Sequence, residues 1–252
     1  MKSLFYLIFI SFIFQGNAQI VNIENKRIST KKDGFSGSVD LNFKLTYATK
    51  QLFQIGDKIK LAYSKKRNYL MLLTDHSLVK SNGNGDFVNK GFEHLRYNYT
   101  LKDSGRVIYE VFQQGQFNKI QKINLRFLTG TGFRFKVVDK KNFQLNLGTS
   151  IMGEYEELVL DQLTVFQDIL SSNYVSFDAQ LTETFGINSI TYFQPKFVDF
   201  GNYRIANETY LRFKFNKYLT FKIVYSLNHD SRNLLDVRKT NYTFSNTLSF
   251  KF

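Results

Sequence analysis

The last twelve residues of the chain alternate between apolar and polar side chains. Their apolar members occupy even positions: Tyr242, Phe244, Leu248, Phe250 and Phe252. A repeat of two residues places the two sets on opposite faces of a β-strand. The apolar face of such a strand must be buried against a core or against lipid. This pattern therefore predicts a sheet, with the C-terminal segment as one of its strands.

The chain ends on an aromatic side chain, Phe252. An amphipathic strand with a terminal aromatic is typical of the closing strand of an outer-membrane β-barrel. Such a terminus resembles the signal read by the barrel-assembly machinery. We therefore expect that machinery to be a partner of the protein and Phe252 to be the assembly signal.

The N-terminus has the three parts of a secretory signal peptide. Lys2 supplies the positive charge, residues 4–14 form the apolar run, and Gly16 and Ala18 are small residues placed for cleavage. We expect residues 1–18 to be the signal peptide, residues 19–34 a periplasmic lead-in, and residues 35–252 the barrel. The chain contains no cysteine, which excludes a lipoprotein anchor and disulfides.

The net charge and the composition limit the kinds of partner that the protein can bind. The formal net charge is +13, a balance that would suit nucleic acid in a cytoplasmic protein. Because the signal peptide predicts export to the outer membrane of a Gram-negative cell, we expect no nucleic acid. Outer-membrane lipids, the phosphates of lipopolysaccharide or a small anionic solute are the expected partners.

The rest of the chain reads as further amphipathic strands. Alternation is clean over residues 35–47, whereas Leu70 to Leu73 run together and leave the face of that strand ambiguous. The count is about 12 strands, an even number as expected for a single-chain bacterial barrel. The fold class is therefore all-β, a transmembrane antiparallel up-and-down β-barrel. Pro195 should end a strand because it has no N–H to donate.

Connection lengths predict which end of the barrel faces outward. Short turns are expected at 65–67, 102–105, 139–141, 186–188 and 216–217, and these would be periplasmic. Long loops are expected at 80–90, 157–173 and 229–239. One alternative function is therefore a docking or adhesion platform built on these three loops.

Charged and polar side chains on the inward faces form the candidate site. By parity they are His94, Arg96, Glu110, Gln114, Arg126, Arg134, Glu154, Glu156, Arg204, Glu208 and Arg212. Charges in a confined lumen must pair or stay hydrated. Three interpretations stay open: a structural plug of Arg–Glu pairs, the lining of a narrow, anion-leaning pore, or paired walls around a small pore.

Enzymatic chemistry has weak support. The three histidines, His76, His94 and His229, lie toward the outer rim, where a lipid-modifying enzyme would work. No motif supplies a nucleophile with its base, and Gly130-x-Gly132 lacks the rest of a nucleotide loop. We expect no catalytic residues, no cofactor and no metal site, and we keep a lipid hydrolase with a rim histidine as an alternative.

An ordered set of motifs lies between about 91 and 156. It comprises His94-Leu95-Arg96-Tyr97-Asn98, Glu110, Gln114-x-x-x-Asn118, Arg126-x-Leu128-x-Gly130-x-Gly132-x-Arg134 and Gly148-x-x-x-x-x-Glu154-x-Glu156. This set resembles the family called domain of unknown function 481, which includes proteins described as salt-stress-induced outer-membrane proteins. The resemblance implies an outer-membrane barrel with a role in envelope integrity or in salt or alkaline stress. It implies no activity or substrate.

Overall fold

The computed structural model describes residues 33–47, 51–81, 85–101, 105–216, 219–232 and 239–250. The predicted signal peptide, most of the predicted lead-in and Phe252 lie outside the described residues. Within the described ranges, no helix is long and apolar enough to cross a membrane.

Twelve antiparallel strands make up the sheet. They are β1 (Gly34–Tyr47), β2 (Gln51–Lys65), β3 (Asn68–Ser81), β4 (Gly85–Thr100), β5 (Val107–Asn118), β6 (Ile123–Lys140), β7 (Phe143–Val159), β8 (Leu163–Gln180), β9 (Phe185–Pro195), β10 (Tyr203–Lys214), β11 (Leu219–Asp230) and β12 (Thr240–Phe250). Each strand pairs with its neighbours in the sequence, so the topology is up-and-down. The predicted fold class and strand number are confirmed.

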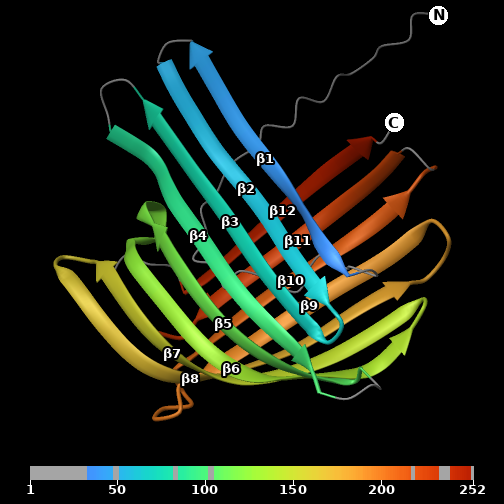
Figure 1. Ribbon diagram of the computed structural model, residues 1–252. Coiled ribbons are helices and arrows are strands. Elements are labelled where there is room, and N and C mark those ends of the chain that lie inside the picture. The colour runs from blue at the N-terminus through green and yellow to red at the C-terminus, as the bar shows by residue number, and fades with distance from the viewer. Residues whose placement is uncertain are drawn as a thin grey trace, which may run out of the picture.

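The sheet coils around an interior. Figure 1 shows β1 to β4 as one wall, β9 to β12 as a second wall behind it, and β5 to β8 curving between them. Residue pairs that are distant in sequence therefore face each other across the interior. The described ladders join β1 only to β2 and β12 only to β11, which makes β1 and β12 the two edges of the sheet.

Side chains are distributed in the opposite way to a soluble protein. On β4, His94 and Arg96 are buried while Leu95 and Tyr97 are exposed. The same alternation on β6 exposes Phe127 and buries Arg126. Apolar side chains outside and polar side chains inside are typical of a membrane-spanning barrel.

Small residues let the walls pack closely. On β7, a Cβ at Gly148 would collide with the ring of Tyr174 on β8. A Cβ at Gly132 on β6 would collide with the backbone and side chain of Thr149 and Ser150. Gly130 and Gly132 therefore lie where strands and side chains approach closely. These are the two glycines that were compared with a nucleotide-binding loop above.

Three predicted connections are wrong. Residues 157–173 do not form a long loop, because β7 runs to Val159, β8 begins at Leu163, and these strands pair along their whole length. Residues 80–90 lie mostly in β3 and β4. The corner expected at 186–188 belongs to β9, and the turn before it spans 181–184. Ladder hydrogen bonds satisfy these backbones, so the strands extend where turns were expected.

Candidate functional site

Six charged side chains meet inside the sheet, and we call them the ion-pair network. They are Arg126 from β6, Glu154 and Glu156 from β7, Arg204 from β10, Asp230 from β11 and Arg232 just after β11. All lie near the strand ends that lead into the β5–β6, β7–β8, β9–β10 and β11–β12 connections. This is the end of the molecule predicted to face outward.

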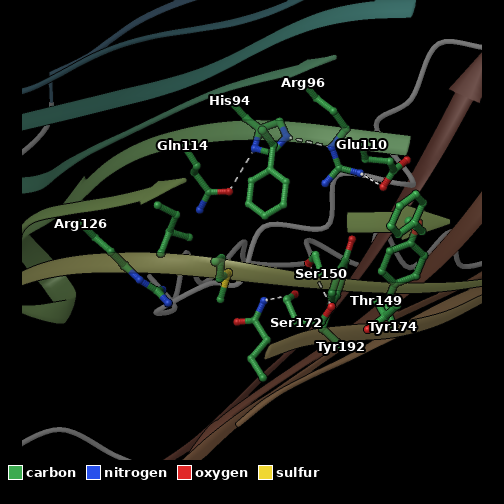
Figure 2. A pocket seen from close by; sticks show the side chains of 15 residues that line it. His94, Arg96, Glu110, Gln114, Arg126, Thr149, Ser150, Ser172, Tyr174 and Tyr192 are labelled. Carbon is green, nitrogen blue, oxygen red and sulfur yellow. Dashed lines mark hydrogen bonds and ion pairs between the residues drawn. The ribbon is translucent and has the colours of Figure 1, made fainter. Parts of the chain in front are cut away.

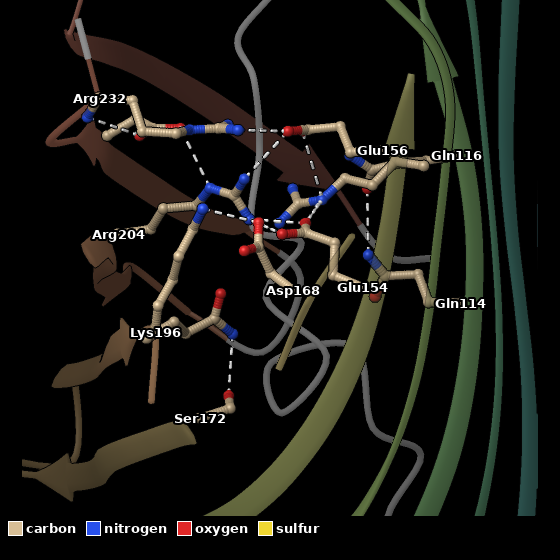
Figure 3. Close-up of polar contacts among 12 residues, drawn as sticks. Gln114, Gln116, Glu154, Glu156, Asp168, Ser172, Lys196, Arg204 and Arg232 are labelled. Carbon is tan, nitrogen blue, oxygen red and sulfur yellow. Dashed lines mark hydrogen bonds and ion pairs between the residues drawn. The ribbon is translucent and has the colours of Figure 1, made fainter. Parts of the chain in front are cut away.

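Arg204 links two walls that are not neighbours. Its Nη1 donates to Glu154 at 2.6 Å to Oε1 and 2.8 Å to Oε2, and its Nη2 donates to Glu156 Oε2 at 3.1 Å. Two strands, β8 and β9, separate β7 from β10 in the sheet. The contact therefore crosses the interior, as Figure 3 shows.

The remaining contacts complete the network. Arg126 Nε donates to Glu154, and Arg232 Nη1 donates to Glu156 Oε2 at 2.6 Å. Asp230 accepts hydrogen bonds from Arg204 Nε at 3.1 Å and from Arg232 Nη2 at 2.7 Å. Three arginines thus face three carboxylates, and the formal charges of the network cancel.

Burial makes this balance necessary. The side chain of Glu154 is 0% exposed and that of Arg126 is 4% exposed. An unpaired charge at such a site is strongly destabilising, so removing one partner costs more than the pair contributes. Burial and the charge of Arg204 act to lower the pKa of Arg232, but Asp230 and Glu156 outweigh them and the pKa is raised. Arg232 therefore stays protonated.

A second polar group, the Glu110 group, lies further from that end. Arg96 Nη1 is 3.3 Å from Glu110 Oε2, and Arg134 Nε is 3.6 Å from Glu110 Oε1. Arg96 Nε donates to His94 Nε2 at 3.3 Å, and His94 Nδ1 lies 3.2 Å from Gln114 Oε1. Because Nε2 accepts, the proton of a neutral His94 sits on Nδ1 and is donated to Gln114. His94, Arg96, Glu110 and Gln114 line the cavity and lie in the upper part of Figure 2.

The structure buries all but two of the eleven side chains predicted to point inward. The exceptions, Glu208 and Arg212, are half-buried on β10. Arg212 Nη2 donates to Gln180 Oε1 at 2.8 Å and lies 3.8 Å from Asp178. These contacts of Arg212 lie outside the ion-pair network, whereas Arg126, Glu154, Glu156 and Arg204 come together within it.

Sequence reasoning missed several charged residues at this end. Asp230 and Arg232 complete the network, and Lys196 pairs with Asp168 at 2.7 Å. Asp168, Asp230 and Arg232 fell inside predicted loops, where parity was not applied. Asp168 and Asp230 lie on strands that continue further than expected, so parity extended along β8 and β11 would have found them.

A small cavity of about 40 Å³ lies between the two groups. Its lining includes Arg96, Glu110, Arg126, Tyr192 and Gln194. Arg126 Nη2 and Gln194 Oε1 are buried and make no hydrogen bond. A space of this size accommodates a few water molecules or one small ion.

Two histidines on the strands, His76 and His229, lie close to hydroxyl or carboxylate groups. His76 Nδ1 lies 3.1 Å from Asp57 Oδ1, but Thr74 Oγ1 donates to Asp57 rather than to His76. His229 lies 2.8 Å from Thr240 Oγ1 with no acid in the contact. The described hydrogen bonds give His76 no hydroxyl partner, so a nucleophile–His–acid arrangement is not assembled there. Within the described ranges, no group of His, Cys, Asp and Glu could hold a metal ion.

Fold and interior together define an up-and-down β-barrel with an apolar outer face and a charged interior. The chain belongs to the family described as protein of unknown function, DUF481, whose model matches residues 29–252. This confirms the resemblance drawn from the motifs between 91 and 156.

Solved porin and channel structures align with most of the chain. A NanC porin structure aligns with a TM-score of 0.46 and 12% identity, covering 85% of this chain and 100% of the porin. A KdgM porin gives 0.40 and 10% identity over 85% and 99%, respectively. A TodX monoaromatic hydrocarbon channel mutant gives 0.44 and 8% identity over 87% and 82%. No curated protein sequence matches the chain.

Proposed function

We propose that the protein is a porin-like barrel of the outer membrane whose outward end is closed by the ion-pair network. The observation that carries this proposal is the contact of Arg204 with Glu154 and Glu156 across the interior. The alternating apolar exterior supports the membrane location. A barrel whose opposite walls are joined by ion pairs at its outward end stabilises the envelope and passes few ions.

Conductance of the refolded mature protein in a planar bilayer tests the closed mouth. We expect the wild type to give small steps or none, and the double variant Arg204→Ser with Glu154→Ser to give larger ones, because both cross-linking side chains are shortened. Lys58→Ser with Asp75→Ser is the matched control, since that pair joins neighbouring strands at 3.7 Å. A heat-modifiable band on a gel verifies folding in each case. Wide-open conductance in the wild type would contradict the proposal.

A narrow, anion-leaning pore is the second candidate, and one observation favours it. Two arginines, Arg96 and Arg126, line the cavity against the single carboxylate Glu110, and Arg126 Nη2 has no hydrogen-bond partner. A cationic lining attracts anions and repels cations. Among the interior residues described above, Asp168, Asp178 and Asp230 offset this excess, so we assign the selectivity to the cavity alone.

The zero-current potential under a salt gradient tests this second candidate. Arg126→Gln should shift the potential toward cation preference, since it removes one positive charge from the lining of the cavity. Lys66→Gln removes the same charge from an exposed turn between β2 and β3 and serves as control. An unchanged potential in Arg126→Gln would rule out Arg126 as a filter.

The salt- or alkaline-stress role rests on the family resemblance. Cells lacking the protein should grow more slowly at high salt or alkaline pH, and the wild-type chain should restore growth. Restoration by Arg204→Ser with Glu154→Ser would separate this role from the closed mouth.

A further inference from the structure

A second cavity lies on the outer wall, away from the ion-pair network. It has a volume of about 480 Å³ and is bordered by β1 to β5. Its apolar lining is provided by Leu41, Phe43, Ile55, Leu78 and Phe117. Cavities of about 300–1,000 Å³ accommodate small organic ligands.

Strand parity shows that this cavity faces outward. On β4 the even residues around it are buried inside, and the odd residue Glu93 is exposed. In the ladders, Asp57 pairs with His76, His76 with Gly91 and Gly91 with Phe117, which places them in one row across four strands. A Cβ at Gly91 would collide with the rings of Phe117 and His76. These two side chains therefore cover Gly91 on the outer face.

The ionisable residues Asp57 and His76 line one border of this apolar cavity, and Glu93 lies next to His76. His76 Nδ1 is 3.1 Å from Asp57 Oδ1, and His76 Nε2 is 3.6 Å from Glu93 Oε1. Thr74 Oγ1 donates to Asp57 Oδ2 at 2.9 Å. Ionisable groups facing lipid are costly in a barrel, and within a membrane they mark functional sites.

The group lies inside the end of β3 rather than at its tip. His76 is five residues from Ser81, the end of β3. Five residues correspond to about 16 Å along a strand, which a tilt of about 45° reduces to roughly 12 Å of depth. A lipid could place its polar head at the ionisable side chains and its chain along the apolar lining.

Charge selects the kind of head group. Two carboxylates, Asp57 and Glu93, share one histidine, so acidic side chains outnumber basic ones in the outward group. A primary ammonium complements it with charge-assisted hydrogen bonds. We propose that this outer-wall cavity binds one phospholipid with an ethanolamine head group.

This inference rests on the membrane location proposed above and is independent of conductance. The test inserts the refolded mature protein into vesicles of equal parts phosphatidylethanolamine and phosphatidylglycerol. A heat-modifiable band verifies insertion, and native mass spectrometry after detergent extraction then counts the retained lipids. We expect the wild type to retain one phosphatidylethanolamine in preference to phosphatidylglycerol.

Two variants and a control make the test specific. Asp57→Asn with Glu93→Gln should reduce retention of phosphatidylethanolamine about tenfold or more, as expected for lost charge-assisted hydrogen bonds. Gly91→Ala should reduce it as well, by pushing His76 and Phe117 into the cavity. Asp75→Asn removes a carboxylate next to His76 in sequence but on the opposite face of β3, and should retain the lipid as the wild type does.

Three results would overturn the proposal. The first is equal retention in the wild type and in Asp57→Asn with Glu93→Gln. The second is equal binding of the two lipids by the wild type. The third is release of free fatty acid that stops in His76→Ala, which would make the cavity a hydrolase site. A chain that fails to insert would instead contradict the membrane location and with it the proposed function.

Discussion

At the scale of single residues, two glycines of β7 show how tightly the interior is packed. Gly148 faces inward against the ring of Tyr174, whereas nothing lies within 4 Å of a Cβ placed at Gly153. Neither residue has a positive φ. Substitution at either position therefore tests space rather than backbone conformation.

We expect Gly148→Ala to destabilise the barrel by about 1–3 kcal/mol, the usual cost of overpacking. Gly153→Ala should change stability little, because its methyl group points to open space on the outer face. Urea unfolding of the refolded protein measures the stability of both variants. The unfolding is followed by tyrosine fluorescence or by a gel shift. Equal midpoints for the two variants would show that Tyr174 moves aside freely.

Alternation along the strands was enough to predict which side chains point inward, including His94, Arg96 and Glu110. It could not predict their partners. Arg204 reaches Glu154 because the sheet curls until β7 and β10 face each other. The two-residue alternation of the sequence does not show how far a sheet curls. The role of Gly148 was equally hidden, since it depends on the rotamer of a ring on the next strand.

At the scale of elements, β1 differs from the central strands. It pairs only with β2 among the described ladders, and its side chains are exposed on both faces from Gly37 to Leu45. An unpaired strand edge cannot remain in lipid, because its N–H and C=O groups need partners. Insertion should therefore bring β1 and β12 together.

Hydrogen–deuterium exchange tests this closure. In bilayers, amides of β1 should be protected to a degree similar to those of β6, which has neighbours on both sides. In detergent below the concentration needed for folding, β1 should exchange faster than β6. Rapid exchange of β1 in bilayers, with β6 protected, would show that the edge stays open.

Strand lengths were predicted less well than strand number. Residues 163–170 were predicted to belong to a loop. Apolar residues occupy both the inward positions, such as Phe166 and Leu170, and the outward positions, such as Leu163 and Val165, so apolar and polar residues do not alternate there. The reason is specific to this interior. Leu170 is buried, and the ring of Phe166 lies 5.2 Å from the guanidinium of Arg232 and 5.9 Å from Lys196 Nζ. Apolar residues thus face inward as well as outward.

At the scale of the whole molecule, the net charge of +13 contrasts with the neutral ion-pair network. The positive excess must therefore lie on other surfaces. Lys119 and Lys239 are exposed at the end that carries the network, and Lys65 and Lys66 are exposed at the opposite end. The first pair is placed to meet lipopolysaccharide phosphates if the topology is as predicted.

We expect the refolded protein to bind lipopolysaccharide and to lose most of this binding between 0.1 M and 1 M salt, as the Debye length falls from about 10 Å to about 3 Å. Lys119→Glu with Lys239→Glu should weaken binding at low salt. Lys65→Glu with Lys66→Glu makes the same charge change at the opposite end and should not. Equal weakening by both double variants would point to net charge alone, and lipid without phosphate would serve as a further control.

The contact across the interior also has a consequence for the order in which the chain is assembled. Arg204 follows Glu154 by 50 positions, and Arg232 follows Glu156 by 76. A half-built sheet that ends at β8 holds two glutamates against Arg126 alone and so carries a surplus negative charge on its inner wall. The last three strands bring the missing arginines, so charge neutrality comes only with the finished chain. A truncated product would keep an uncompensated carboxylate, and would be the less stable species in the membrane.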